Sequence, residues 1–248
     1  MSLPVIDTHT HFGTFGEWDC PLPQLTALMD AYGIDRAVVG DMASNTAGAA
    51  AFEDSLAAIH GYEDRLRLML WVNPALPKDA LIAAKVLSRY RDRVACMKIH
   101  PLTSGVPLGD ARYLPYLELC KRYQLTLASH TGPGELCPME KLARMAAENP
   151  DVNFVAVHME MRGDHRLAME LVSKHPNLYG DTTFLPIPDI RAAIDRCGKE
   201  KLLFGSDAPI LNGRYDTALP DIRAMLTPDE AECLFSRNAL RLFDSGSV

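Results

Sequence analysis

Two histidines spaced two apart near the beginning of the chain offer the first chemistry in the sequence. His9 and His11 close the run Val-Ile-Asp-Thr-His-Thr-His. Alternate side chains of a β-strand point to the same face and lie about 7 Å apart along it, so both imidazoles can reach one cation between them. The spacing therefore predicts a metal site at the end of a first strand.

Further residues of metal-binding or catalytic type stand at the ends of later apolar runs. Each run is short and rich in Val, Leu, Ala or Phe, which is typical of buried parallel strands. The residues at the run ends are Lys98, His130, His158 and Asp207. One such residue per strand end is the arrangement needed at the mouth of a barrel, where the carboxyl ends of parallel strands meet.

The whole chain alternates strand-like runs with amphipathic stretches of helical length, which favours parallel βαβ units over hairpins. Strands are predicted near residues 5–11, 36–41, 66–72, 94–98, 125–130, 152–158, 178–182 and 202–207. Helices are predicted between them, for example at 23–32, 80–90, 112–123, 140–148, 165–174 and 189–196. Eight such units predict an α/β fold of the closed (β/α)₈ type, a TIM barrel.

A single domain over residues 1–248 accounts for this pattern, because no linker rich in Pro, Gly or Ser interrupts the repeat. An extra C-terminal helix is expected over 228–243, opened by Thr227 as N-cap with Glu230 three residues on. The competing fold is an open doubly wound sheet, which calls for a glycine-rich phosphate turn after an early strand. Here the first strand ends in histidines, which favours the barrel.

Alternation within the strands adds an expectation about direction. If one alternate set faces the barrel axis, ligands from different strands converge on one point. The sequence places each candidate in phase with an apolar residue of its own strand: His9 and His11 with Val5, Lys98 with Cys96, and His158 with Phe154.

A set of imidazole nitrogens and a carboxylate oxygen suits zinc, with cobalt, manganese, nickel or iron as substitutes. Structural zinc sites are usually closed and rich in cysteine, whereas a histidine and carboxylate site in a barrel mouth keeps one position open for water. The pKa of water on such an ion falls from about 15.7 toward about 7, which supplies hydroxide at neutral pH. The ligand types therefore predict a catalytic site.

Composition limits the partners. The formal net charge is −7, whereas nucleic-acid binders usually present a basic face, so a small-molecule substrate is expected and no nucleic acid. No apolar stretch approaches the about 18 residues that cross a bilayer, so no membrane role is expected. Oligomeric state is not readable, although an exposed helix face of a barrel suits a homo-oligomer.

The cellular location is expected to be cytoplasmic. No basic segment followed by an apolar core marks a signal peptide before the first strand. Six cysteines occur without a Cys-x-x-Cys pair, which favours reduced, buried thiols over disulfides. Cys137 is the exception to watch, because its loop should lie near the barrel mouth.

Six motifs follow one another along nearly the whole chain. They are Asp-Thr-His-Thr-His at 7–11, Met-Lys-Ile-His-Pro at 97–101, Ser-His-Thr-Gly at 129–132, Val-His at 157–158, Phe-Gly-Ser-Asp-Ala-Pro at 204–209 and Arg-Asn-Ala-Leu-Arg-Leu-Phe at 237–243. In this order they resemble the amidohydrolase superfamily, in particular the amidohydrolase-related branch that holds decarboxylases, lactonases and hydratases. Together the motifs are specific for the superfamily and say little about the substrate.

The resemblance implies one role for each strand-end residue. The implied metal ligands are His9, His11, His130 and Asp207. His158 would be the acid or base beside a single Zn²⁺, or a ligand of a second metal. Lys98 decides between these, because in binuclear relatives a lysine at this point is carboxylated and bridges both ions, while in mononuclear relatives it contacts substrate. One metal is the preferred alternative, with other divalent ions as substitutes for zinc.

Three functions stay open. A hydrolase would use Asp207 or His158 to take a proton from metal-bound water, and the other to protonate the leaving group of an ester, lactone or amide. A lyase, either a non-oxidative decarboxylase or a hydratase, would use the metal to hold a carboxylate or phenolate. A non-catalytic metal-binding barrel is the third reading. A metal-dependent hydrolase is the prediction.

Loop residues suggest the kind of substrate. Lys98, Arg162 and Arg214 are candidates for binding a carboxylate-bearing substrate. Three aromatic residues of the first loop would either line an apolar wall of the site or plug the barrel rim: Phe12, Phe15 and Trp18. The remaining histidines are expected at a turn, in helices or on surface loops: His100, His60, His165 and His175.

Overall fold

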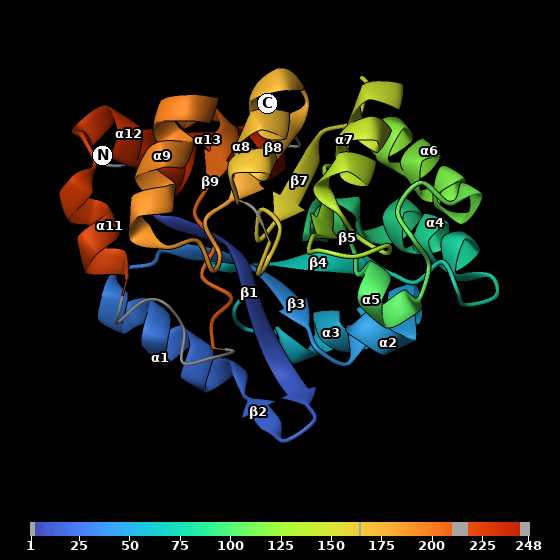
Figure 1. Cartoon of the computed structure of the whole chain (residues 1–248). Helices are drawn as coiled ribbons and strands as arrows, with labels where there is room; N and C mark the ends of the chain where they lie inside the picture. The colour runs from blue at the N-terminus through green and yellow to red at the C-terminus, as the bar shows by residue number, and fades with distance from the viewer. Residues whose placement is uncertain (1–2, 164, 210–217, 244–248) are drawn as a thin grey trace.

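A curled sheet of parallel strands forms the centre of the protein in the computed structural model, which describes residues 3–163, 165–209 and 218–243 (Figure 1). In this part of the chain, neighbouring strands are parallel in the order β1-β3-β4-β5-β6-β7-β8-β9, and β2 adds an antiparallel edge to β1. The strands are β1 (Ile6–Phe15), β2 (Trp18–Cys20), β3 (Arg36–Asp41), β4 (Leu66–Val72), β5 (Val94–Ile99), β6 (Leu127–His130), β7 (Phe154–Val157), β8 (Leu178–Asp181) and β9 (Leu202–Leu203).

Backbone hydrogen bonds join the two ends of this sheet. Thr8 N donates to Phe204 O at 2.8 Å, and further along Asp207 N donates to His9 O at 2.8 Å. His11 N donates to Ala208 O at 2.7 Å. The segment after β9 therefore lies against β1, and the eight parallel strands close as the sequence predicts. The fold is a single-domain (β/α)₈ barrel.

Helices cover the outside of the barrel (Figure 1). Within the described residues, those of seven residues or more are α1 (Leu22–Tyr32), α3 (Phe52–Ala58), α4 (Asp79–Tyr90), α6 (Leu114–Tyr123), α7 (Met139–Glu148), α8 (His165–Lys174), α9 (Ile187–Cys197) and α11 (Leu219–Met225). Short helices α2 (Ser44–Ala47) and α5 (Pro101–Ser104) lie in the connections after β3 and β5. Local signals set the ends: α1 has a proline in its first turn and stops at Gly33, whose φ of 66° is left-handed.

The extra C-terminal helix is present, with one local change. It runs as α12 (Pro228–Glu232), a π-helical turn (Cys233–Arg237) and α13 (Asn238–Phe243). Thr227 Oγ1 accepts from Glu230 N, and the Glu230 carboxylate accepts from Thr227 N, so the predicted capping box forms. The start of this helix is therefore stabilised by two satisfied backbone donors.

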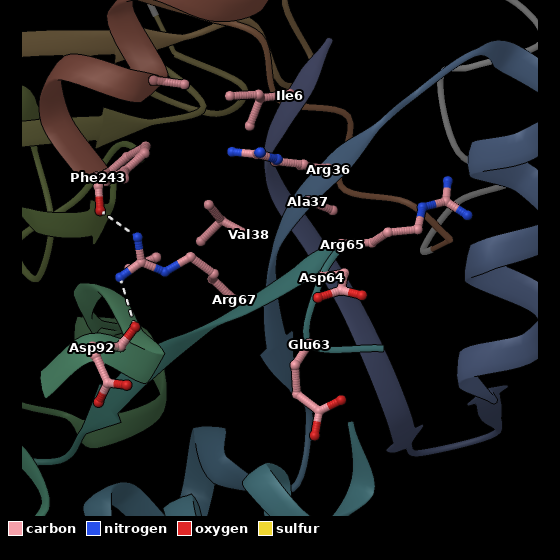
Figure 2. Close-up of a pocket in the computed structure, with 12 residues that line it drawn as sticks. Ile6, Arg36, Ala37, Val38, Glu63, Asp64, Arg65, Arg67, Asp92 and Phe243 are labelled. Carbon is pink, nitrogen blue, oxygen red and sulfur yellow. Dashed lines mark hydrogen bonds between the residues drawn. The ribbon is translucent and has the colours of Figure 1, made fainter. Parts of the chain in front are cut away.

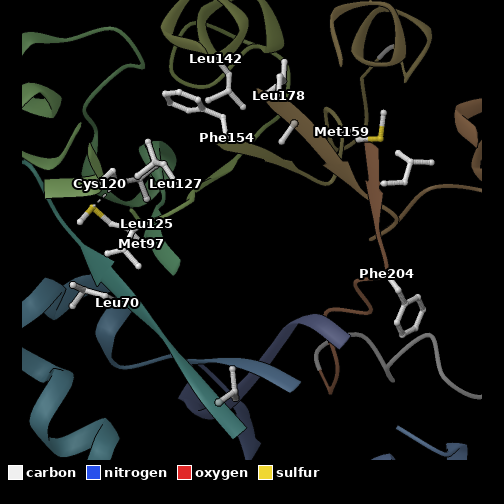
Figure 3. Packing of buried hydrophobic residues seen from close by; sticks show 14 of the residues in the cluster. Leu70, Met97, Cys120, Leu125, Leu127, Leu142, Phe154, Met159, Leu178 and Phe204 are labelled. Atoms are coloured by element: carbon white, nitrogen blue, oxygen red, sulfur yellow. Dashed lines mark hydrogen bonds between the residues drawn. The ribbon is translucent and has the colours of Figure 1, made fainter. Parts of the chain in front are cut away.

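The buried apolar residues in the described part of the chain form two separate clusters. The larger lies between the strands and the surrounding helices, and Figure 3 shows part of it, including Leu70, Met97 and Phe154. The smaller takes residues from each of the eight parallel strands and, among the described helices, from α13 alone. This smaller cluster contains strand residues such as Ile6, Trp71 and Cys96 but no residue of the helices that surround the barrel. We therefore assign it to the inside of the barrel.

These clusters correct the predicted alternation. Cys96 lies in the inner cluster, as expected for the strand of Lys98, but Val5 packs against the outer cluster and Phe154 belongs to it. In β1 the pairing with β3 shifts between Asp7 and Thr10, so a bulge rather than simple alternation changes which side chains face inward. In β7 the inward residues are Val155 and Val157, and the strand ends before His158.

The first loop was wrongly predicted, because β1 continues to Phe15 and pairs with β2 as a hairpin. Phe12 is buried in the outer cluster, which fits the reading as a plug, and Trp18 is 43% exposed. Neither lines the cavity described below, so the expected apolar wall is not formed by them. The side chain of Phe15 lies outside the described residues.

The C-terminal helix closes the end of the barrel where the strands begin. A cavity of about 250 Å³ lies there. Figure 2 shows it between the first residues of β1, β3 and β4. Arg67 donates to Phe243 O at 3.0 Å and to Asp92 O at 3.0 Å, which ties α13 to β4 and to the turn before β5. This end of the barrel is thus held by backbone carbonyls and arginine.

The cysteines and the helix lengths bear on two further expectations, reduced thiols and no membrane role. All six cysteines are free, and five of them are buried. No described helix is both long and apolar enough to cross a membrane.

Candidate metal centre

Three donor atoms converge at the end of the barrel where the strands finish. His9 Nε2 and His11 Nε2 are 3.1 Å apart. Asp207 Oδ1 lies 2.9 Å from His11 Nε2 and 3.4 Å from His9 Nε2, and all three residues are buried. Ligand atoms about 2.0 Å from a tetrahedral zinc ion are themselves about 3.3 Å apart. The three separations therefore match one shared cation.

The other nitrogen of each imidazole has an acceptor. His9 Nδ1 lies 3.0 Å from Asp181 Oδ2, and His11 Nδ1 lies 3.3 Å from Gly40 O. A carbonyl or carboxylate oxygen accepts hydrogen bonds, so Nδ1 is the protonated nitrogen in both rings. Each Nε2 therefore presents its lone pair to the shared point, as in metal sites where an outer partner fixes the tautomer.

Two more imidazoles complete the donor set. In the described part of the chain, the buried atoms His130 Nε2 and His158 Nδ1 have no hydrogen-bond partner. Their rings meet edge to face with centroids 4.9 Å apart, and the His158 ring is 5.1 Å from that of His9. An unsatisfied buried nitrogen is costly unless something else occupies its lone pair. The residues present therefore fit a divalent cation.

A cavity of about 220 Å³ opens onto these atoms. Its lining contains every described residue predicted for the site. The lining residues are His9, His11, Met42, Asn45, Trp71, Lys98, His100, His130, His158, Met161, Arg162, Phe184 and Asp207. The structure thus brings together side chains from β1, β4, β5 and β6 and from the segments that follow β3, β7, β8 and β9.

Lys98 lies inside this cluster. Its side chain is 1% exposed, its Nζ is 3.4 Å from His9 Nε2, and it stands over the Trp71 ring at 5.6 Å. Burial lowers the pKa of Lys98 to about 8, against the opposing charges of Asp181 and Asp207. The lysine is therefore close enough to influence any cation held by the two N-terminal histidines.

His158 and Asp207 share a backbone feature that strand predictions miss. Both lie just beyond their strands in the left-handed region, with φ of 70° for His158 and 62° for Asp207. Such values are uncommon for residues with a β-carbon and concentrate at functional sites. This backbone turn directs each side chain into the cavity. Continued alternation along the strand would not give that direction.

Burial governs the charge of the imidazoles. It lowers the pKa of His130 to about 3 and of His100 to about 2, and it holds the pKa values of His9 and His158 well below the usual range. The charge of Lys98 contributes in each case. The rings are therefore neutral near pH 7, which is the form that binds a cation or accepts a proton.

The remaining predicted residues separate into three groups. Arg162 is exposed at the cavity rim with φ of 63°, and Arg214 lies outside the described residues. His100 lines the cavity, yet its Nδ1 also accepts from Thr103 N at the start of α5, so the expected turn role holds. The other three histidines do not line the cavity. His60 is exposed in a turn, His165 is the half-buried first residue of α8, and the half-buried His175 follows the end of that helix.

Two kinds of residue were missed from the sequence. Asp181 ends a strand that was predicted, and an acidic residue after the run Leu-Tyr-Gly was the available signal. Trp71 and Phe184 supply the aromatic part of the lining, and no local pattern marks them. Cys137 is buried, and burial raises its pKa to about 11, which disfavours the reactive thiolate near pH 7.

Comparison with known proteins identifies the family of the chain. A family model described as amidohydrolase matches residues 6–244. No curated protein matches the sequence significantly.

Among solved structures, a protein of Pseudomonas putida provisionally named 2-pyrone-4,6-dicarboxylic acid hydrolase is similar with a TM-score of 0.75, 17% identity and 100% of both chains covered. A zinc-bound amidohydrolase of Burkholderia multivorans has a TM-score of 0.75 and 16% identity, covering 97% of this chain and 99% of its own.

A 5-carboxyvanillate decarboxylase of Novosphingobium aromaticivorans, complexed with manganese and a nitrobenzoic acid, has a TM-score of 0.74 and 15% identity. The alignment covers 98% of this chain and 96% of that one. At these identities the likeness supports the barrel fold, while the family model decides membership. The chain belongs to the amidohydrolase family and is an enzyme.

Proposed function

We propose that the protein is a metal-dependent hydrolase that acts on an ester, lactone or amide of a small, carboxylate-bearing molecule, within a single domain over residues 1–248. One observation carries the proposal: His9 Nε2, His11 Nε2 and Asp207 Oδ1 lie within 3.4 Å of one another with their acceptor atoms facing a common point. His130, whose Nε2 is buried and unpaired among the described residues, is the fourth proposed ligand.

Zinc is the proposed ion, because a borderline set of imidazole and carboxylate ligands suits it. When bound, the ion supplies a Lewis acid and lowers the pKa of water toward about 7. The chain itself supplies the proton transfers. His158 Nδ1 is buried at the cavity without a described partner, so it can accept the proton of the attacking water and return it to the leaving group. Asp207 can assist with its carboxylate.

Two positively charged side chains at the cavity support the proposal of a carboxylate-bearing substrate. The Arg162 guanidinium lies at the rim of the cavity, and Lys98 lies buried inside it. A charged hydrogen bond to either group would fix one end of the substrate while its carbonyl meets the proposed metal. The cavity of about 220 Å³ limits that substrate to a small molecule.

We propose one ion rather than two. A second cluster of donors exists, made of His9, His158 and Asp181. However, if His9 Nε2 binds the ion shared with His11 and Asp207, only His9 Nδ1 is left for this second cluster. His9 Nδ1 already hydrogen-bonds to Asp181. The two-ion alternative would use a carboxylated Lys98 as bridge, together with His158.

A lyase is the second candidate, favoured by the aromatic lining. Trp71 borders the cavity with its ring stacked on that of His100, and Phe184 borders it beside the His158 ring, which suits a flat substrate ring. Three of the similar solved structures are decarboxylases of aromatic acids, one of them complexed with 2,6-dihydroxybenzoate. In such a reaction His158 would take up a proton from water and deliver it to the carbon that carbon dioxide leaves.

One experiment separates these functions. The zinc content of purified protein is measured, and the protein is then assayed on lactones, esters, amides and aromatic carboxylic acids for acid release and for carbon dioxide. We expect one equivalent of zinc and acid release. Carbon dioxide release would select the lyase, and a metal-loaded protein without turnover would select a non-catalytic barrel.

The variant His158→Asn tests the proton-transfer role in the same assay. We expect turnover to fall about 10²–10⁴-fold while one equivalent of zinc stays bound. His60→Asn is the matched control, because His60 is exposed and pairs with Glu63 far from the cavity. Loss of a second equivalent of metal in His158→Asn would contradict the one-ion proposal.

A further inference from the structure

Asp181 contacts both His9 and His158, two residues of the site that are far apart in the sequence. It is the last residue of β8 and is 1% exposed. Its Oδ2 lies 3.0 Å from His9 Nδ1, and its Oδ1 accepts from His158 N at 2.7 Å and from Thr183 N at 3.2 Å. One carboxylate thus contacts the ring of a proposed ligand and the backbone of the proposed acid or base.

The contact with His9 determines which nitrogen of that ring faces the proposed ion. When ionised, the carboxylate can only accept, so it places the proton on Nδ1 and leaves the lone pair on Nε2. With the opposite tautomer, an N–H would point at Asp207 Oδ1, 3.4 Å from Nε2, and no lone pair would be available for a metal. The ligand quality of His9 therefore depends on Asp181.

The contact with His158 holds a segment of costly backbone. His158, Met159, Glu160 and Arg162 all have positive φ, between 44° and 70°. Such a run persists only where surrounding contacts determine it. On one side Thr131 binds the run, through Glu160 N to its Oγ1 at 2.8 Å and Met161 N to its O at 3.0 Å.

The end of β8 contributes the support on the other side. Asp181 holds the first residue of the run through the His158 N–H. Gly180 leaves room for the next side chain, because a β-carbon there would lie 2.5 Å from Met159 Sδ. The same strand end therefore sets both the direction of His158 and the space beneath it.

We infer that Asp181 is a positioning residue that sets the His9 tautomer and the His158 backbone together, so that the metal ligand and the proton-transfer group are aligned by one side chain. The inference rests on the proposed function for its catalytic meaning. Its structural content, a fixed His9 tautomer and a protected His158 amide, does not depend on any bound ion.

The variant Asp181→Asn tests the inference, because an asparagine has similar shape but carries an NH₂ donor group in place of one acceptor oxygen. If its amide faces His9, the NH₂ group meets Nδ1 and moves the ring proton to Nε2. If it flips, the NH₂ group meets His158 N–H and that amide loses its acceptor. We expect zinc affinity to fall about 10–100-fold, the typical effect of losing an outer partner of a ligand.

Nitrogen NMR of the metal-free protein and amide hydrogen exchange provide readouts that do not use activity. The variant should show either the altered His9 tautomer or faster exchange at His158. Wild-type protein with its proton on Nε2 of His9 would overturn the inference without any variant. So would an Asp181→Asn protein whose zinc affinity, His9 tautomer and His158 exchange all equal those of wild type.

Asp79→Asn is the matched control. Asp79 is also a buried carboxylate, and it accepts from Ala49 N, Asn73 N and Tyr116 Oη away from the donor cluster. Its substitution should lower thermal stability but leave zinc affinity and the His9 tautomer unchanged. If wild type binds no zinc, the proposed function fails, while the tautomer and exchange measurements still decide the role of Asp181.

Discussion

Asp207 Oδ1 lies 2.9 Å from His11 Nε2, across the seam where the chain after β9 meets β1. His11 Nδ1 faces the carbonyl of Gly40, which can only accept, so this nitrogen carries a proton. Two acceptor atoms at this distance repel each other unless a proton or a metal cation lies between them. Closure of the barrel therefore creates the site that a divalent ion would stabilise.

Replacing Asp207 tests this relationship directly. Asp207→Ala removes one of the three converging atoms, so we expect zinc affinity to fall by more than the about 10–100-fold typical of an outer partner, with a parallel loss of turnover. Competition with a chelator measures the affinity. Glu118→Ala is the control, since that carboxylate is exposed and pairs only with Lys121 among the described ion pairs. Unchanged zinc affinity in Asp207→Ala would refute the ligand assignment.

Lys98 reports on the number of ions. Lys98→Met keeps the length of the side chain and removes a charge 3.4 Å from His9 Nε2. We expect zinc to remain at one equivalent and to bind more tightly, because a positive charge next to the ion is removed. Metal analysis and titration measure both quantities. If the wild type holds two equivalents and the variant one, a bridging lysine is present instead.

Arg162 is predicted to bind the substrate carboxylate. A hydrogen bond to a charged group contributes about 1.5–3 kcal/mol, so Arg162→Gln should raise KM about 10–150-fold with little change in kcat. Steady-state kinetics on a carboxylate substrate and on its neutral ester form the test. An equal effect on both substrates would show that Arg162 acts on the loop rather than on the carboxylate.

The neutral imidazoles make the metal-free protein sensitive to acid. In the unfolded chain a histidine takes up a proton near pH 6.5, whereas burial lowers the pKa of His130 to about 3 and of His100 to about 2. The unfolded state therefore binds more protons below about pH 6.5. The free energy of unfolding should fall as pH decreases from there toward about 3, by at most about 1.4 kcal/mol per pH unit for each imidazole.

Two carboxylates act in the opposite sense. Burial raises the pKa of Asp181 to about 7 and also raises that of Asp79, so the folded state holds protons that the unfolded state releases above about pH 4. The imidazoles with lowered pKa outnumber them, so the net loss in acid remains. Urea unfolding of metal-free protein at several pH values measures it. His130→Asn should flatten the pH dependence, His60→Asn should not, and a stability that rises on acidification would contradict the argument.

Much of the fold followed from the sequence because its signals are local. Alternating strand and helix patterns gave the barrel, and the pair Thr227 and Glu230 marked the C-terminal helix before any tertiary contact was known. The strand-end residues lie together for a topological reason: parallel strands finish at the same end of a barrel. Residue type and position in the repeat were therefore enough to identify the neighbourhood of His9 and Asp207.

The tertiary structure determined the directions of the site side chains and their hydrogen-bond partners. The inward turn of His158 depends on a left-handed φ supported by Asp181 and Thr131, which no run of apolar residues encodes. The bulge in β1 shifts the phase on which simple alternation relies. Side chains such as Trp71 and Phe184 join the cavity only because distant segments pack there. The sequence alone determined which groups can do chemistry and at which end of the barrel. The closed fold determined the orientation of these groups, because that orientation depends on hydrogen bonds between strands far apart in the chain.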